Sequence, residues 1–121
     1  MTRKNHYNYY KLIKNFVKYF YPINAMPNSE KIIYTFILAE FYDSVHSYGR
    51  FKMRYQDIGK KTGFAETSAV KAMRGLMSYP IPFIFLEKKE KRRTNIYRIN
   101  EAIFTDWKKA LDENFLNRGI K

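Results

Sequence analysis

One segment, residues 55–98, restricts the possible fold more than any other part of the chain. A helical pattern, a tight turn, a second helical pattern and two strand-like runs follow one another in it, at residues 56–61, 62–64, 66–77, 83–86 and 95–99. The residues between the two runs are mostly basic. This order predicts a unit that can lay one helix in the major groove of DNA and place a charged loop against the neighbouring backbone.

Two glycines mark the turn between the predicted helices. Gly63 lies in the turn itself, where a positive φ is often required and a residue without a Cβ has no steric penalty. Gly59 takes the small position where the two helices approach closely, and Ile58 and Phe64 are expected inside. Spacings of three and four residues predict the inward face of the second helix, with Ala72 at its edge: Ala69, Met73 and Leu76.

The opposite face of the second helix supplies the candidate DNA contacts. Thr67, Ser68 and Lys71 lie toward its N-terminal end, from which side chains reach base edges most easily. Arg74 is placed to reach phosphate, while Ala65 stands where a Ser or Thr N-cap is usual. Three neighbouring cations complete this part of the predicted DNA-binding set: Arg54, Lys60 and Lys61.

The hairpin is predicted to form a second contact region. Its tip is placed to follow phosphates or enter the minor groove, although a charged hairpin tip can also be a solvated surface. We expect Phe83 and Phe85 to meet the pair Ile96/Ile99 across the strands. Residues 50–55 alternate apolar and basic side chains, which predicts a third strand paired with the hairpin. The tip holds more cations than carboxylates: Lys88, Lys89, Lys91, Arg92 and Arg93 against Glu87 and Glu90.

Residues 57–76 resemble the helix-turn-helix of winged-helix proteins, and residues 27–100 contain the elements of that fold in the same order. The closer resemblance is to the N-terminal DNA-binding domains of plasmid and phage replication initiators and replisome organisers. It implies a non-enzymatic DNA-binding protein that serves replication of a mobile genetic element. Because family members usually continue into a further domain, it implies an accessory role for a chain that stops at Lys121. Three stretches carry this closer resemblance: the aromatic-rich residues 9–16, the Asn-Ser-Glu-Lys helix opening at 28–31 with Ile33-Tyr34 behind it, and Asn95-Ile96-Tyr97-Arg98-Ile99.

Helical patterns flank this unit. Apolar residues of 9–20 fall on one face, and Lys11, Lys14 and Lys18 lie on the other. A strongly apolar helix from about Ser29 to Ser47 is expected at the centre of the fold, with other elements packed on two of its sides. We therefore expect an α+β, mostly α fold: a winged helix-turn-helix with a three-helix core, a small antiparallel β-sheet and extra N- and C-terminal helices. One domain covers 1–121, with its core at 27–100, an N-terminal helical extension at 1–26 and a C-terminal helix at 101–121.

The placement of charge agrees with a polyanion partner. The net charge is +12, of which residues 50–98 contribute +9 and residues 1–29 contribute +5, while residues 30–49 carry −2 and residues 99–121 are neutral. A charge that serves only solubility need not concentrate on one module. Double-stranded DNA is therefore the expected partner.

Catalysis, cofactors and metals find little support in the sequence. There is no Cys, so disulfides and thiol chemistry are excluded, and the only histidines are His6 and His46. The segment Gly59-Lys60-Lys61-Thr62-Gly63 lacks the spacing of a phosphate-binding loop. No apolar run reaches the roughly 18 residues of a membrane span, and no signal peptide is evident. A cytoplasmic protein that is not an enzyme is expected, with no cofactor and no metal.

The sequence also allows other partners and other functions. Trp107, Leu111 and Phe115 recur at helical spacing and either dock a replication protein or a second copy, or pack within the chain. Tyr7, Tyr9 and Tyr10 lie among cations and either stack on single-stranded DNA or join the core. An interaction subunit on a winged-helix frame, which binds a polymerase, helicase or host factor, and a small dimeric transcriptional regulator are the alternative functions.

Overall fold

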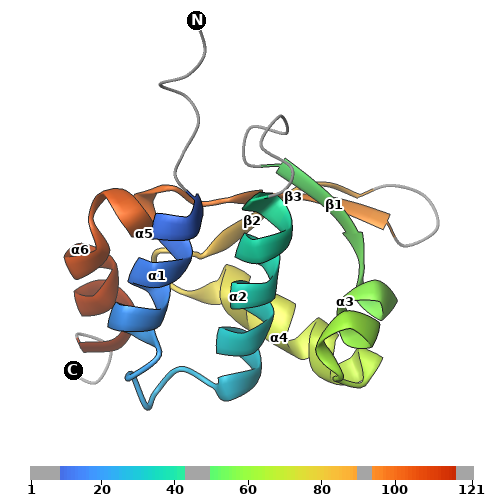
Figure 1. The fold of residues 1–121 in the computed structure, drawn as a ribbon, viewed down its shortest axis with the longest axis horizontal. Helices are drawn as coiled ribbons and strands as arrows, with labels where there is room; N and C mark the ends of the chain where they lie inside the picture. The colour runs from blue at the N-terminus through green and yellow to red at the C-terminus, as the bar shows by residue number, and fades with distance from the viewer. Residues whose placement is uncertain (1–8, 43–49, 90–93, 117–121) are drawn as a thin grey trace, which may run out of the picture.

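The computed structural model describes residues 9–42, 50–89 and 94–116, and these form a mostly helical α+β fold with one small sheet (Figure 1). The predicted α+β, mostly helical class is therefore confirmed, and the order α2, β1, α3, α4, β2, β3 is compatible with the expected winged-helix layout. The elements are α1 (Tyr9–Phe20), α2 (Asn28–Tyr42), β1 (Arg50–Arg54), α3 (Tyr55–Thr62), α4 (Glu66–Ser78), β2 (Ile84–Lys89), β3 (Thr94–Ile99), α5 (Ala102–Thr105), α6 (Trp107–Leu111) and the π-helical η4 (Asp112–Leu116).

Helix α2 lies at the centre because its apolar side chains cover more than one face. Ile33, Tyr34, Ile37 and Leu38 are all buried, and α2 packs against both α1, which lies beside it, and α4, which crosses behind it (Figure 1). Burial raises the pKa of the Tyr34 phenol, whose O–H donates to the Phe83 carbonyl over 3.4 Å. The predicted central helix is thus present, and its expected end at Ser47 lies outside the described residues.

Helix α1 covers α2 with one face and leaves its lysines in solvent, as predicted. Leu12, Phe16 and Phe20 are buried, while Lys11, Lys14 and Lys18 are exposed. Phe16 is the centre of an aromatic cluster: its ring centroid lies 5.4 Å from that of Phe20, 4.8 Å from Tyr34 and 6.0 Å from Phe83. Rings at these separations stabilise a core beyond their buried area, so α1 belongs to the folded domain.

The three strands form an antiparallel sheet in the order β1-β3-β2, which confirms that β1 pairs with the hairpin. The expected apolar contacts within the hairpin were partly wrong. Tyr97 and Ile99 of β3 are buried, as are Phe83 and Ile84, whereas Ile96 is only half-buried. Successive strand residues point to opposite sheet faces, so Ile96 and Ile99, three residues apart, cannot share one face. Phe85 pairs with Arg98 on the other face, where the guanidinium carbon lies 4.9 Å from its ring centroid.

The C-terminal segment was predicted as one helix at 101–121, and this prediction was wrong for the described residues. Asp106 (φ −146°, ψ 71°) separates α5 from α6, and its carboxylate accepts the backbone N–H of Lys109. An Asp in this position caps a new helix rather than continuing the old one. After α6 the backbone widens into η4, where the buried Asn114 side chain bonds both the N–H and the carbonyl of Ile81.

The turn between α3 and α4 has the predicted conformation. Gly63 has a φ of 86°, and its N–H donates to the Gly59 carbonyl over 2.8 Å. A Cβ on Gly59 would lie 2.6 Å from the Phe64 carbonyl oxygen, which is closer than real side chains approach backbone. Helix α4 buries Ala69, Ala72, Met73 and Leu76. The glycine pair therefore fixes how closely α3 approaches the start of α4.

We expect Gly59→Ala to lower the free energy of unfolding by about 1 kcal/mol or more. Inside a helix Ala usually gains up to about 1 kcal/mol over Gly, but the backbone clash is of the overpacking kind that costs about 1–3 kcal/mol. Urea denaturation measures the difference. The matched control is Gly63→Asn, because nothing lies within 4 Å of a Cβ there and Asn tolerates a positive φ. A Gly59→Ala variant as stable as the wild type would contradict the close approach.

Candidate nucleic-acid interface

The outward face of α4 presents the four side chains predicted to contact DNA. Thr67, Ser68, Lys71 and Arg74 are all exposed, because the opposite face of α4 is held in the core. Among the described residues, neither Lys71 nor Arg74 forms an ion pair. Their cationic groups are therefore available to an anionic partner.

Helix α4 begins at Glu66 without a capping side chain. Ala65 precedes it in an extended conformation and makes no side-chain cap bond, so neither Thr67 nor Ser68 takes over that function. The first backbone N–H groups of a helix carry partial positive charge, and an uncapped end leaves them to water or to a ligand oxygen. The first-turn Glu66 is exposed and offsets part of this charge.

The basic side chains around α3 differ in whether they form ion pairs within the chain. Lys60 is exposed and has no ion pair with a described residue, and Lys61 lies 3.9 Å from a Glu40 carboxylate oxygen. Arg54 is bound more firmly, since its Nε and Nη2 donate to the two carboxylate oxygens of Asp57 over 3.0 Å and 3.2 Å. These hydrogen bonds lower the pKa of Asp57 and raise that of Arg54. Arg54 therefore binds within the chain as well as facing solvent.

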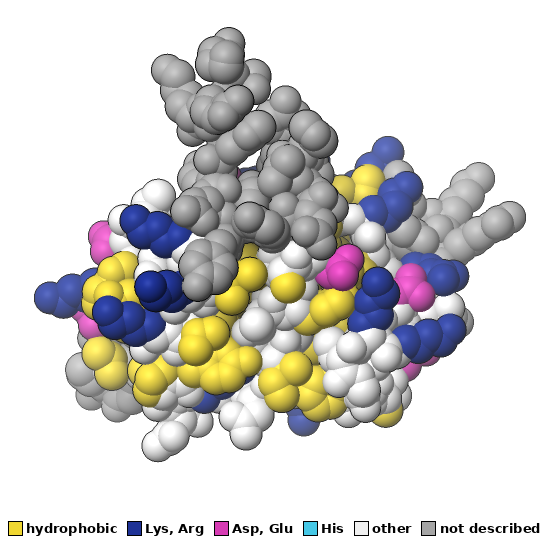
Figure 2. Space-filling model, in the orientation of Figure 1, with side chains coloured by type: hydrophobic (Ala, Val, Ile, Leu, Met, Phe, Trp, Pro, Cys, Tyr) yellow, Lys and Arg dark blue, Asp and Glu magenta, His cyan; other side chains and the backbone are white. Residues whose placement is uncertain are grey.

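The structure describes two of the five cations that were predicted at the hairpin tip. Lys88 and Lys89 are exposed at the end of β2, whereas Lys91, Arg92 and Arg93 lie outside the described residues. Figure 2 shows basic side chains gathered over the sheet and α3 on one side of this view, and over α1 and its neighbours on the other.

Two salt bridges that cross the sheet were not predicted from the sequence. Glu87 on β2 accepts from Arg50 on β1 and from Arg98 on β3, each over 2.8 Å. No local pattern indicates this arrangement, because the three residues come from three different strands. Two of the arginines counted in the basic excess are thus already bound to a carboxylate.

The predicted partner-binding residues pack within the chain. Trp107 stacks on Tyr19 with ring centroids 3.6 Å apart and planes 11° from parallel. Leu111 and Phe115 are partly buried against the core, and the Phe115 ring lies 5.1 Å from that of Tyr79. The intrachain alternative accounts for these contacts, so partner binding would have to use only the exposed edges of the three side chains.

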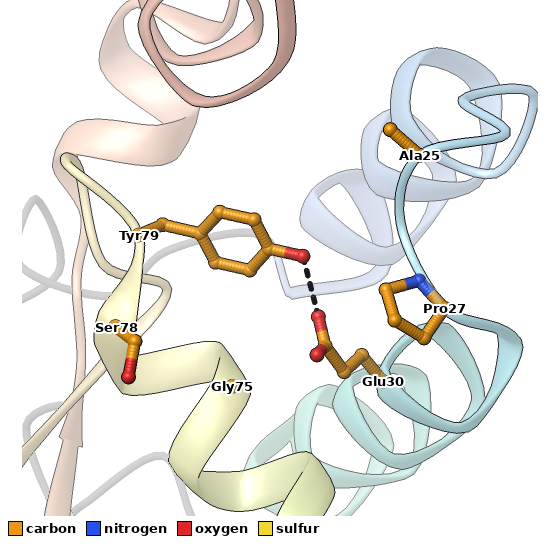
Figure 3. A pocket seen from close by; sticks show the side chains of 6 residues that line it. All are labelled: Ala25, Pro27, Glu30, Gly75, Ser78 and Tyr79. Atoms are coloured by element: carbon orange, nitrogen blue, oxygen red, sulfur yellow. Dashed lines mark hydrogen bonds between the residues drawn. The ribbon is translucent and has the colours of Figure 1, made fainter. Parts of the chain in front are cut away.

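A small pocket lies where α2 meets the end of α4. It has a volume of about 250 Å³ and is lined by Ala25, Pro27, Glu30, Gly75, Ser78 and Tyr79. In Figure 3 the Tyr79 side chain points from the end of α4 toward Glu30 on α2, and its O–H donates to the carboxylate over 2.5 Å. In the sequence, Glu30 is part of the Asn-Ser-Glu-Lys opening of its helix. Its buried position against Gly75, 45 residues later, has no local sequence signal.

Comparisons of the chain with protein-family models, with curated proteins and with solved structures give no match. Within residues 9–42, 50–89 and 94–116, no helix is long and apolar enough to cross a membrane. The same ranges contain no group of three His, Asp or Glu side chains placed to hold a metal ion.

We expect Trp107→Ala to lower the free energy of unfolding by roughly 2 kcal/mol, because it removes a half-buried ring and its stack on Tyr19. The free energy of unfolding is measured by urea denaturation. Unfolding is followed by far-UV circular dichroism, because the variant lacks the only tryptophan of the chain and so its fluorescence signal. Leu116→Ala is the control, since Leu116 is 61% exposed and should change stability by no more than about 0.5 kcal/mol. A Trp107→Ala variant as stable as the wild type would contradict the structural role of the ring and would again make Trp107 a candidate for partner binding.

Proposed function

We propose that the chain is a non-enzymatic winged-helix protein that binds double-stranded DNA, with α4 in the major groove. The observation that carries the proposal is the division of α4 into two faces. One face is anchored by Ala69, Met73 and Leu76, and the other exposes Lys71 and Arg74 without intrachain ion pairs to described residues. A helix fixed from behind with free cations in front is the form that recognition helices take.

The roles along α4 follow from position. Thr67 and Ser68 lie in its first turn, from which hydroxyl groups can donate to or accept from base edges. Lys71 and Arg74 lie one and two turns further along and are assigned to bases or phosphates. Lys60 and Lys61 on α3, together with Lys88 and Lys89 on β2, are assigned to the flanking backbone.

The biological role proposed is an accessory or initiator factor in replication of a plasmid, phage or other mobile element. It is supported by the resemblance of residues 9–16, 28–34 and 95–99 to replication initiators and replisome organisers. The runner-up is an interaction subunit or a small dimeric regulator. A footprint separates the last of these, since a dimer protects two half-sites one helical turn apart.

The test is the double variant Lys71→Glu/Arg74→Glu. We expect its affinity for duplex DNA at low salt to fall at least about tenfold, because two contacts become repulsive. Its circular dichroism and unfolding midpoint should stay those of the wild type, since both side chains are exposed. Fluorescence anisotropy with a labelled duplex measures the affinity, and a single strand of the same sequence gives the preference.

The matched control changes charge by the same amount elsewhere. Lys108 and Lys109 are exposed on α6 and have no ion pair with a described residue, so Lys108→Glu/Lys109→Glu tests the effect of net charge alone. If the wild type neutralises about six phosphates, log affinity falls against log salt with a slope of about −5, and the α4 variant should reduce that slope toward about −3. Unchanged binding by the α4 variant, or an equal loss in the control, would refute the assigned contacts.

A further inference from the structure

The outer face of the sheet brings two arginines and an aromatic ring into one row across the three strands. Arg50 on β1 and Phe85 on β2 are both register partners of Arg98 on β3. The neighbours of Arg98, Tyr97 and Ile99, are buried on the other face, so alternation along the strand places this row on the side away from the core. Arg50 and Arg98 are exposed accordingly.

Glu87 places one carboxylate between the two arginines. Its Oε1 accepts from Nε of Arg50 and its Oε2 accepts from Nε of Arg98, each over 2.8 Å. The two guanidinium groups therefore converge on a single small anion. Glu87 is the one acidic residue in the sequence of the three strands, residues 50–54, 84–89 and 94–99. Two positive charges against one negative charge leave this cluster cationic.

Much of the hydrogen-bonding capacity of the two arginines is unused. A guanidinium group carries five N–H donors in a rigid fork, and the Nε–H is only one of them. Within the part of the chain that the structure describes, neither Arg50 nor Arg98 donates from its Nη groups. These groups can therefore form the two parallel hydrogen bonds by which a guanidinium binds a phosphate.

The Phe85 ring holds one of the two guanidinium groups in place. The guanidinium carbon of Arg98 lies 4.9 Å from the ring centroid, which is within the range of a cation–π contact. A side chain held in this way loses less conformational entropy on binding than one that moves freely. Arg98 is thus partly preorganised for an anionic ligand.

The Glu87 carboxylate can be displaced from the arginines at a small cost. The side chains of Arg50 and Arg98 are 61% and 44% exposed, and that of Glu87 is 25% exposed. Ion pairs as exposed as these contribute little to stability, because water and salt screen them. A phosphate that moves the carboxylate aside therefore replaces weak bonds. Glu87 thus competes with an outside anion for the same two arginines.

We propose that Arg50 and Arg98 form a clamp for a phosphate of the DNA backbone, and that Glu87 occupies this clamp in the free protein. The inference rests on the proposed function for the choice of DNA as the partner, and it adds a contact on the sheet to those assigned to α4. A polyanion fits better than a single acidic side chain of a protein, because residues 50–98 carry a net charge of +9, most of which one carboxylate would leave unused.

The test is a cycle of variants of the full chain, measured by fluorescence anisotropy with a labelled duplex at low salt. Glu87→Gln removes the competing charge and keeps the shape of the side chain, so we expect the affinity to rise at least about threefold. Arg50→Gln/Arg98→Gln should lower the affinity about tenfold and reduce the salt slope by about 1. The decisive variant combines all three changes, because the gain from Glu87→Gln should disappear when the two arginines are absent.

The control for charge alone is Glu113→Gln. Glu113 is exposed on η4 and forms no ion pair with a described residue, so this variant should raise the affinity by less than about twofold. The unfolding midpoint in urea of every variant should stay close to that of the wild type, since the substituted side chains are all exposed.

The possible failures are distinguishable. If the wild type does not bind the duplex, the proposed function fails together with this inference. If Lys71→Glu/Arg74→Glu weakens binding while Glu87→Gln raises the affinity no more than Glu113→Gln does, the inference alone is wrong. If Glu87→Gln shows the expected gain while the α4 variant binds as the wild type does, the clamp is supported and the contacts assigned to α4 are wrong.

Two further outcomes would overturn the clamp. If Glu87→Gln raises the affinity as much without the two arginines as with them, Glu87 acts through its charge alone. If Glu87→Gln strengthens binding of a labelled oligoglutamate peptide more than binding of the duplex, the two arginines belong to a site for an acidic protein segment instead.

Discussion

The burial of α2 on two sides determines what the rest of the molecule can present to solvent. Tyr34 and Leu38 are fully buried, and the Tyr34 ring touches Phe16 of α1 and Phe83 ahead of β2. With both flanks of α2 covered, α1 and α4 are each held by one face and leave the other free. Cations cannot be buried cheaply without partners, so they collect on those two free faces. The exposed positions of Lys14 on α1 and of Lys71 on α4 thus follow in part from the apolar character of one helix.

Features set by local backbone geometry were predictable from the sequence. The positive φ of Gly63 and the close approach at Gly59 depend on which residues can occupy a tight turn, and both agree with the structure. The inward face of α4 follows from a period of 3.6 residues, so its outward face, with Lys71 and Arg74, followed as well. In each case the deciding interactions lie within about ten residues of chain.

Other features were not predictable in the same way, either because they depend on distant partners or because a short-range side-chain bond competes with the main sequence pattern. Which of Ile96 and Tyr97 is buried depends on the register of β3 between two neighbours, and one residue of slip exchanges the faces. The apolar repeat of the C-terminal segment predicts one continuous helix. The helix nevertheless breaks at Asp106, because the Asp106 carboxylate caps a new helix by accepting the Lys109 N–H. Arg54 was predicted to contact DNA, but in the folded chain its Nε and Nη2 donate to the carboxylate of Asp57, three residues away. Charge counted along a sequence therefore overstates the charge that a surface offers.

This division between bound and free cations also bears on how the candidate interface would work. The arginines of the sheet, Arg50 and Arg98, both donate to Glu87, and these exposed hydrogen bonds link the three strands to one another. Such bonds favour a fixed shape for the hairpin more than they add stability. Within residues 9–42, 50–89 and 94–116, the cations for which no ion pair is found, such as Lys60 and Lys71, are mostly lysines, which act as point charges on phosphate. An interface built in this way takes its affinity mostly from lysines and loses affinity as salt rises. Any sequence preference then has to come from the first turns of α4, where Thr67 and Ser68 lie.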